Sequence, residues 1–321
     1  MAKKFDVSVC VAIYNSDPLQ LFMTLASMIR QKQVSFEVIV ADDGSVSDMS
    51  EQIRAFFKAE GFEDYKILRS EKNNGTVINY LRAAVSSSGK YIKCISAGDL
   101  FYSETSLSEL MRYMERNSLD ACFTDAVYYN SRGLPEVSVD LQIVGVHRKR
   151  YLYLQKLCYL ILSDRACGAA WLVRREEFLR YMRLFANKVR FCEDSIYCLM
   201  IMDEKRVGFR YEPSIYYHYG DGLSTAKNET WPLKLREDDN AVNLIQLRRC
   251  RGNSFFEKRY RFFLRFFDAR KRLINIVLKM FVFPEVLPLW ILQKTRRRKN
   301  VKSASFAFLE ECRSAAEKFM L

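Results

Sequence analysis

Apolar residues in the first hundred positions occur in short β-branched runs that alternate with longer stretches of helical periodicity. A short apolar run between turn residues predicts a strand, and apolar residues spaced three to four apart predict a helix. The predicted strands are 7–13, 36–41, 65–70 and 91–96, and the predicted helices are 18–31, 49–60 and 76–87. This order predicts an α/β fold with a parallel sheet, right-handed crossovers and helices on both faces.

The alternation is less regular after residue 100. The middle of the chain is predicted to form helices at 104–117, 148–162 and 175–186, and strands at 119–129, 168–174 and 207–219. From residue 228 onward the sequence has the pattern of helices and is rich in aromatic and basic residues. We therefore expect a sheet-containing domain at 1–227 and a helical C-terminal region at 228–321.

Charge is concentrated in one segment of this C-terminal region. The 321-residue chain has 51 Lys and Arg against 38 Asp and Glu, a net charge of +13. The segment 248–302 holds 17 basic and 3 acidic residues, so the rest of the chain is close to neutral. This distribution excludes a uniformly basic nucleic-acid-binding protein. With 49% hydrophobic residues, the chain is also too apolar for a disordered protein.

The cysteine and histidine content bears on the compartment and on metal sites. Nine cysteines occur at scattered spacings without a C-x-x-C pair, which indicates reduced thiols and not a secreted disulfide framework. Only two histidines are present, so a structural zinc site of the Cys/His type has no adequate ligand set. The N-terminus has no apolar signal-peptide segment, and we expect a cytoplasmic protein.

Polar clusters stand where three of the predicted strands end. They are residues 14–17, 42–45 and 96–99. Because the carboxyl ends of parallel strands meet at one edge of the sheet, these clusters are expected to converge. Neither a G-x-G-x-x-G nor a G-x-x-x-x-G-K-[ST] motif is present. The clusters carry carboxylates instead, which bind phosphates through a divalent metal or accept hydrogen bonds from a base imide or sugar hydroxyls.

Six segments of the chain resemble those of family 2 glycosyltransferases with the GT-A fold, of the bacterial cell-surface polysaccharide type. The segments are VSVCVAIYN (7–15), FEVIVADDGSVSD (36–48), NNGTVIN (73–79), GKYIKCISAGDLFY (89–102), RFCEDSIY (190–197) and YYHYGDGLST (216–225). The resemblance covers roughly residues 5–225. It implies a Rossmann-like, mostly parallel sheet flanked by helices, followed by the helical basic region.

The resemblance assigns the first two strand ends to the nucleotide of a sugar donor. Ala12 and Tyr14 are expected to line the base, and Asp43 to accept a hydrogen bond from the imide N–H of uracil. The other expected donor-binding residues are Asp42, Asn74, Asn79 and Ser96. The alternative is that Asp42 and Asp43 are turn and cap residues, as Asp–Gly sequences often are.

A divalent metal is implied at residues 96–99, where the family has a D-x-D motif. Here Asp99 alone retains a carboxylate, and the resemblance implies that it binds Mn²⁺ or Mg²⁺ together with the donor diphosphate. His218 is a second expected ligand of the metal or of a phosphate. The alternatives are that Asp99 caps a following helix and that His218 is a packing residue.

The Glu193–Asp194 pair matches the family's acidic pair before a helix. An inverting transferase needs a base that removes the proton of the acceptor hydroxyl while that hydroxyl attacks the anomeric carbon. Asp194 is expected to be this base, and Glu193 to orient the acceptor. The alternative is that both are acidic residues favoured by the dipole of the helix start.

The segment 255–272 is expected to form an amphipathic helix. One face carries the cations Lys258, Arg261, Arg265 and Arg272, and the other the aromatic residues Phe255, Phe256, Tyr260, Phe262, Phe263, Phe266 and Phe267. This composition is typical of a helix that lies at an anionic membrane surface. Dimerisation through the apolar stripe, nucleic-acid binding and a solvated charged face are the alternatives.

Residues 273–292 are almost entirely apolar and long enough to span a bilayer. Lys279 and Glu285 argue against a span, as do Pro284 and Pro288. We expect a kinked segment that inserts shallowly or packs in protein. A polybasic patch follows at 294–299.

The expected function is an inverting, metal-dependent glycosyltransferase, peripheral at the inner face of the cell membrane. The donor is expected to be a nucleotide-sugar, in particular a UDP-sugar. The acceptor is expected to be a hydroxyl of a lipid-linked glycan, in cell-surface polysaccharide, O-antigen or capsule synthesis. No nucleic-acid partner is expected, and a homodimer is left open. Two alternatives are a non-catalytic membrane-associated partner protein on the same fold and a nucleotidyltransferase.

Overall fold

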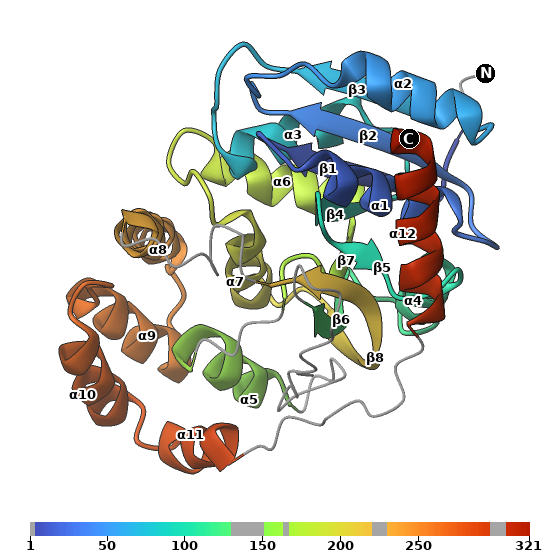
Figure 1. Ribbon diagram of the computed structural model, residues 1–321. Coiled ribbons are helices and arrows are strands. Elements are labelled where there is room, and N and C mark those ends of the chain that lie inside the picture. The colour runs from blue at the N-terminus through green and yellow to red at the C-terminus, as the bar shows by residue number, and fades with distance from the viewer. Residues whose placement is uncertain (1–3, 130–150, 163–166, 220–229, 296–305) are drawn as a thin grey trace.

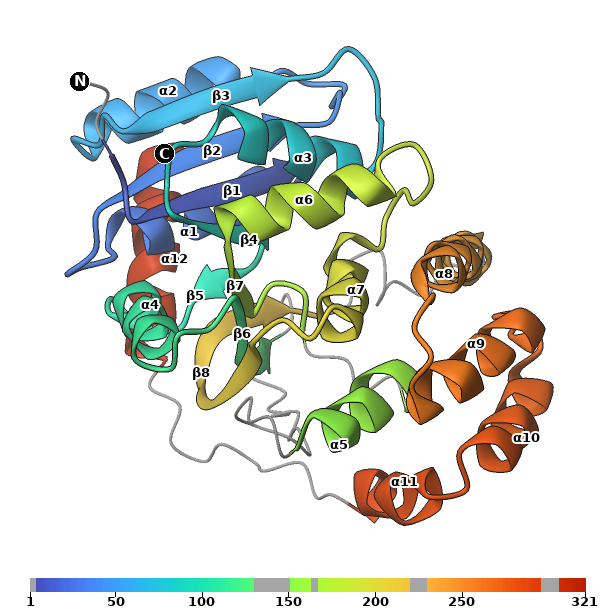
Figure 2. The same ribbon diagram turned by 180° about the vertical axis from the view of Figure 1, so that it is seen from behind.

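The computed structural model describes residues 4–129, 151–162, 167–219, 230–295 and 306–321 (Figure 1). Within these residues, eight strands form one sheet in the order β3-β2-β1-β4-β7-β6-β8-β5. Helices cover both faces of the sheet, as the alternating pattern of the sequence predicts (Figures 1 and 2).

The first four strands form the parallel half of the sheet. They are β1 (Val7–Ile13), β2 (Phe36–Asp42), β3 (Tyr65–Arg69) and β4 (Tyr91–Ser96), and all four were expected from the sequence. Strand β1 pairs in parallel with both β2 and β4, so its carboxyl end lies between theirs. This arrangement brings the three polar strand ends to one edge.

The second half of the sheet is mixed. Its strands are β5 (Leu100–Phe101), β6 (Ala121–Tyr129), β7 (Trp171–Arg174) and β8 (Val207–His218). Strand β7 runs antiparallel to β4 and to β6, whereas β6 and β8 are parallel. The β6–β8 register ends at the Tyr129–His218 pair, which carries His218 to the same edge as the first four strands.

Two apolar cores lie on opposite faces of the sheet. One face is covered by α1 (Pro18–Ile29), α2 (Ser50–Ala59), α4 (Ser106–Arg116) and α12 (Ala307–Met320). The other is covered by α3 (Thr76–Ser86), α6 (Arg175–Phe185) and α7 (Ile196–Met202). Helix α1 begins where the sequence predicts, because Pro18 occupies its first turn and the Asp17 carboxylate accepts the N–H of Gln20 at 3.0 Å.

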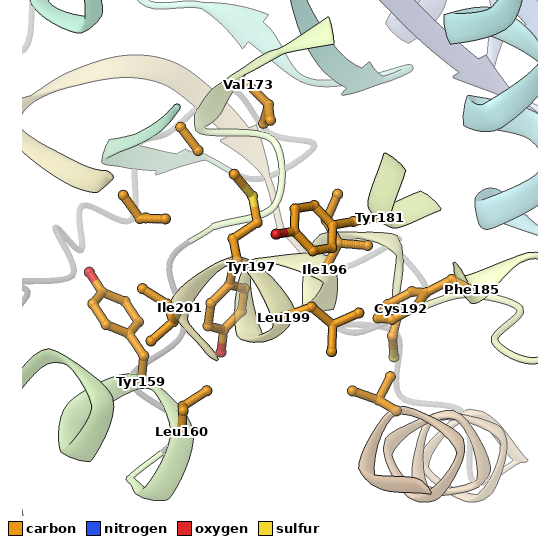
Figure 3. Packing of buried hydrophobic residues seen from close by; sticks show 14 of the residues in the cluster. Tyr159, Leu160, Val173, Tyr181, Phe185, Cys192, Ile196, Tyr197, Leu199 and Ile201 are labelled. Carbon is orange, nitrogen blue, oxygen red and sulfur yellow. The ribbon is translucent and has the colours of Figure 1, made fainter. Parts of the chain in front are cut away.

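Helix α7 stands between the sheet and the C-terminal helices. Figure 3 shows Ile196, Leu199 and Ile201 of α7 packed among aromatic side chains of neighbouring elements.

The predicted helix 148–162 is shorter in the described residues: α5 (Leu152–Lys156) continues as one π-helical turn, Leu157–Ile161. Residues 148–150 of that prediction lie outside the described residues.

Four helices follow in the C-terminal region: α8 (Thr230–Arg249), α9 (Phe255–Phe266), α10 (Arg272–Val282) and α11 (Val286–Thr295). The prediction of one helix over 255–272 is wrong beyond Phe266. The chain turns at Asp268, whose backbone N–H and C=O are both bonded by the side chain of Asn275. The predicted kink in 273–292 falls at Phe283 and Pro284, between α10 and α11.

The aromatic residues of α9 are divided between the core and the surface. Phe256, Tyr260 and Phe263 are buried in the core shared with α7, whereas Phe262 and Phe266 are exposed. The expectation of an aromatic face that lies at a membrane surface therefore does not hold for Phe256, Tyr260 and Phe263, which hold α9 on the protein. Residues 296–299 of the predicted polybasic patch lie outside the described residues.

Helix α12 returns to the opposite side of the molecule and packs on α1 (Figure 1). Phe319 stacks edge-on against Phe22 and Phe56, with ring centroids 4.8 Å and 5.1 Å away. Arg30, the C-cap residue of α1, donates a hydrogen bond to Glu311 at 3.0 Å. The C-terminal region thus contacts the sheet-containing domain through α8 and α9 on one face and α12 on the other.

We expect Leu309→Ala to lower the free energy of unfolding by about 2–4 kcal/mol, because this side chain is fully buried against α1. Urea denaturation of the full chain measures the change. Met320→Ala, at a half-exposed position of the same helix, is the control and should change it by less than about 0.5 kcal/mol. Equal effects of the two substitutions would show that α12 is not part of this core.

Candidate active site

The carboxyl ends of β1, β2 and β4 border a cavity of about 990 Å³. Nine of the eleven residues predicted from the sequence line it: Ala12, Tyr14, Asp43, Asn79, Ser96, Asp99, Glu193, Asp194 and His218. The two predicted residues that do not line it are Asp42 and Asn74. The topology therefore gathers residues from strand ends and from the loop before α7 around one volume.

Asp43 fixes the turn that leads into α3. Its Oδ1 accepts the N–H of Asn74 at 3.0 Å and its Oδ2 accepts the N–H of Gly75 at 2.8 Å. Gly75 has φ +91°, and a Cβ there would lie 2.4 Å from Cγ of Arg190, so only glycine fits. Asn74 does not line the cavity, and its side-chain amide donates to the Lys72 carbonyl at 2.8 Å.

Asp42, one residue earlier, stabilises the turn and does not line the cavity. Its carboxylate accepts hydrogen bonds from the N–H and the hydroxyl of Ser45, at 2.9 Å and 2.7 Å, and pairs with Arg69 at 2.7 Å. This is the turn arrangement left open in the sequence analysis. Asp42 and Asp43 are adjacent, but only Asp43 reaches the cavity.

Asn79 presents a buried acceptor to the cavity wall. Its Nδ2 donates to the carbonyl of Ala41 at 2.7 Å, while its Oδ1 finds no hydrogen-bond partner among the described residues. The side chain is 1% exposed. A buried polar atom left unpaired in this way is costly unless a ligand or water pairs it.

Asp99 and His218 meet at the edge of the cavity. Oδ1 of Asp99 accepts the backbone N–H of His218 at 3.0 Å, and Oδ2 accepts that of Ser96 at 3.4 Å. Burial raises the pKa of Asp99 to about 7. The interpretation of Asp99 as a helix cap is wrong, because the next helix, α4, begins at Ser106.

A metal site made by the protein alone is not found in the part of the chain that the structure describes, where no three His, Cys, Asp or Glu side chains gather. The nearby donors are the carboxylate of Asp99 and the imidazole of His218. Carboxylate oxygen and imidazole nitrogen both suit Mn²⁺, with further ligands from a diphosphate and water. These residues therefore fit a divalent ion that arrives with a nucleotide.

Glu193 and Asp194 open the single 3₁₀ turn that precedes α7. The hydroxyl of Thr76 in α3 donates to Oε2 of Glu193 at 2.7 Å. Burial raises the pKa of Glu193, and the negative charge of Asp194 raises it further. Asp194 abuts Gly168, where a Cβ would lie 3.1 Å from its Oδ2, so a small residue there leaves room for the carboxylate.

Other lining residues were not identified from the sequence. Arg190 donates to the backbone and side-chain oxygens of Asn73 at 3.2 Å, and its position in the RFCEDSIY segment was a signal that could have been used. Lys234 and Leu235 reach the cavity from α8. The sequence around these two residues does not mark them as cavity residues, because their position depends on where α8 packs.

The sequence also matches known proteins. The model of the family described as Glycosyl transferase family 2 matches residues 8–180, more than half of the chain. An uncharacterized glycosyltransferase of Rickettsia bellii is 32% identical over 112 residues, which are 35% of this chain. That alignment covers only 15% of the relative, so the chain spans a small part of its length.

Two solved structures share the fold over almost the whole chain. S. aureus TarS 1–349 in complex with UDP-GlcNAc has a TM-score of 0.54 at 17% identity, covering 98% of this chain and 91% of that chain. Mannosyltransferase PcManGT from Pyrobaculum calidifontis, in complex with GDP-Man and Mn²⁺, has a TM-score of 0.56 at 13% identity, covering 99% and 86%. These similarities confirm the predicted GT-A fold.

Glu193→Gln is expected to stabilise the protein at neutral and alkaline pH. The raised pKa means that the folded state holds the proton more tightly than the unfolded state, so wild-type stability falls as pH rises above the ordinary value of 4.5. Glutamine keeps the shape without the ionisation. We expect an unfolding temperature at least about 2 °C above wild type at pH 8, and no difference near pH 4.

The control for this series is Glu51→Gln, which removes a carboxylate from an exposed position in α2. Thermal unfolding of the three proteins across pH 4–9 gives the comparison. A Glu193→Gln variant that is less stable than wild type at pH 8 would contradict the burial-driven shift.

Proposed function

The chain belongs to glycosyl transferase family 2, and on that basis we propose that it transfers a sugar from a UDP-sugar to a hydroxyl of a glycan acceptor, with inversion at the anomeric carbon. The observation that carries the proposal is the convergence of Asp43, Asp99 and Asp194 on one cavity. They come from three separate segments, and each has the chemistry that one part of this reaction requires.

The nucleotide is proposed to lie against β1 and β2, with Ala12 and Tyr14 beside the base. Asp43 and Asn79 both line the cavity and both carry oxygen acceptors, although the Asp43 oxygens also accept the N–H groups of Asn74 and Gly75. The ring N–H of uracil is a donor, so two acceptors favour this base over one that presents an acceptor there. Support for a nucleotide-sugar donor comes from TarS with UDP-GlcNAc and PcManGT with GDP-Man.

Asp99 and His218 would hold a divalent cation, Mn²⁺ or Mg²⁺, with Ser96 close to the donor. When bound, the ion supplies positive charge that stabilises the departing nucleoside diphosphate. Burial removes the Asp99 carboxylate from water and so raises its pKa. A bound cation would offset the cost of burying the ionised carboxylate. Arg190 offers a further positive charge at the cavity wall.

The acidic pair before α7 is proposed to act on the acceptor. Glu193 has the raised pKa and therefore favours its protonated form, which donates a hydrogen bond and orients the acceptor. Asp194 then carries the negative charge of the pair and removes the proton of the attacking hydroxyl. Because both side chains line the cavity, the acceptor hydroxyl is proposed to enter between them and the sugar.

The acceptor is proposed to be a lipid-linked glycan of cell-surface polysaccharide, O-antigen or capsule synthesis, with the protein docked on the inner face of the membrane. Leu273, Val277 and Phe281 form an apolar stripe on α10, and each is more than two-thirds exposed. The exposed cations Lys271 and Arg272 lie at the start of this helix, and Arg270 beside them is paired with Asp268. Apolar residues beside cations suit an anionic lipid surface better than water.

Among the described residues, no helix combines the length and the apolar character needed to cross a bilayer. Helix α10 has eleven residues and ends before Pro284, so docking is proposed to be interfacial. The homodimer left open in the sequence analysis is the competing use of the same stripe.

The proposed reaction predicts that UDP stabilises the full chain against thermal unfolding only when Mn²⁺ is present. UTP, GDP and nucleotide-free Mn²⁺ are the comparison ligands. Asp194→Asn should keep this stabilisation but lose about 100-fold or more in sugar transfer, measured as UDP release from a panel of UDP-sugars. The control Asp48→Asn changes an exposed carboxylate that does not line the cavity.

Normal turnover by Asp194→Asn would overturn its assignment as the base. The absence of any nucleotide effect on wild type would favour the non-catalytic partner protein. Preference for the triphosphate would favour a nucleotidyltransferase.

The membrane proposal predicts that Phe281→Asp weakens binding to phosphatidylserine-containing vesicles by about tenfold or more, because an inserted ring is lost and a like charge is added. Vesicle co-sedimentation measures it, with Val85→Asp at an exposed position of α3 as the matched control. Binding should also fall at high salt and on pure phosphatidylcholine vesicles. A change in oligomeric mass without a change in vesicle binding would instead assign the stripe to a dimer.

A further inference from the structure

One carboxylate of the C-terminal region binds the loop that leads to the acidic pair. Asp238 lies in α8 and is 6% exposed. Its Oδ1 accepts the backbone N–H of Arg190 at 3.0 Å, and its Oδ2 accepts those of Phe191 and Cys192 at 2.5 Å and 3.1 Å. Three consecutive N–H groups are thus paired with a single side chain, and the next residue is Glu193.

The other side of the same loop is bound by α3. The backbone N–H of Val77 donates to the carbonyl of Arg190 at 3.1 Å, and the hydroxyl of Thr76 lies 2.9 Å from the carbonyl of Phe191. The N–H groups of the loop therefore point to α8 and its carbonyls point to α3. Two helices far apart in the sequence define the backbone path immediately before Glu193.

The loop 190–192 stabilises the negative charge of Asp238 through hydrogen bonds. Among the described residues Asp238 makes no ion pair, so the backbone N–H dipoles provide its stabilisation. Hydrogen bonds to an ionised acceptor are shorter and about twice as strong as neutral ones. A neutral side chain of the same shape would keep fewer of the three bonds, because an amide nitrogen cannot accept an N–H.

We propose that Asp238 is a positioning residue, which holds the 190–192 loop so that Asp194 and Glu193 face the acceptor. The proposal rests on the proposed function of that pair. It makes the C-terminal region part of the catalytic apparatus and not only a docking module. Asp238 does not line the cavity, and it acts through the backbone of residues 190–192.

A positioning role and a merely structural role predict different results. If Asp238 only holds α8 on the protein, its loss lowers stability and disturbs the nucleotide site together with the rest of the cavity. If it aims the acidic pair, its loss slows the transfer step while the site for the nucleotide, formed by β1, β2 and β4, keeps its affinity. A misplacement of about 1 Å is enough to reduce turnover by roughly 100-fold.

The test compares full-length Asp238→Asn with the control Glu237→Gln, which removes the same charge from an exposed neighbour in α8. Hydrogen–deuterium exchange of peptides covering 188–196 reports on the three N–H groups. We expect exchange there to be at least about tenfold faster in Asp238→Asn than in the control. Asp238→Ser, which leaves space for water in place of the carboxylate, serves if the asparagine variant does not fold.

The second readout separates binding from turnover. With the UDP-sugar that wild type cleaves fastest, we expect kcat of Asp238→Asn to fall about 100-fold, with KM for the donor and the UDP-induced thermal shift within twofold of wild type. Unchanged exchange at 190–192, or a fall in nucleotide affinity that matches the loss of turnover, overturns the positioning role. A wild-type chain that releases UDP from no donor overturns the proposed function instead.

Discussion

Buried aspartates that accept hydrogen bonds from backbone N–H groups are the interaction on which the cavity depends. Loops removed from water must pair their N–H groups, and here the partners are carboxylates. Asp43 accepts backbone N–H groups of the turn before α3, and Asp99 accepts the backbone N–H at the end of β8. Asp238 accepts those of the loop before α7. Two of these carboxylates, Asp43 and Asp99, also line the cavity. Under the proposed function, a bound cation would offset the repulsion between them and the donor diphosphate.

The sequence was sufficient where local pattern and topology determine position. Parallel pairing of β1 with β2 and β4 brings Asp43 and Asp99 to the same edge of the sheet, and that could be predicted from strand ends alone. The distinction between Asp42 and Asp43 could not, because it depends on where β2 stops and on Arg69 of β3. Asp238 was invisible for a related reason: its partners lie 46 to 48 residues away, and nothing in a charged helical segment marks one acid among several.

The excess of positive charge in the C-terminal region has two separate uses, which composition alone cannot distinguish. Arg259 makes a bidentate pair with Glu285 and lies over the ring of Phe283 at 4.4 Å, so it joins α9 to the turn between α10 and α11. Arg249 bonds Asp203 at 2.7 Å. Arg259 thus joins helices within the C-terminal region, and Arg249 joins α8 to the end of α7. Among the described residues, the charge available to a partner is therefore smaller than their composition suggests, and it includes the exposed Lys271 and Arg272 at the start of α10.

Helix α12 covers α1 from a distant part of the chain, and this has a consequence for biosynthesis. Arg30 and Glu311, which join the two helices, are 281 positions apart. At about 5–20 residues per second, α1 leaves the ribosome roughly 15–60 s before α12. Throughout that interval the apolar surface that receives Leu309 and Ala316 has no native cover. The nascent chain is then a target for chaperones that bind exposed apolar helices, and its first core is completed only when α12 has been synthesised.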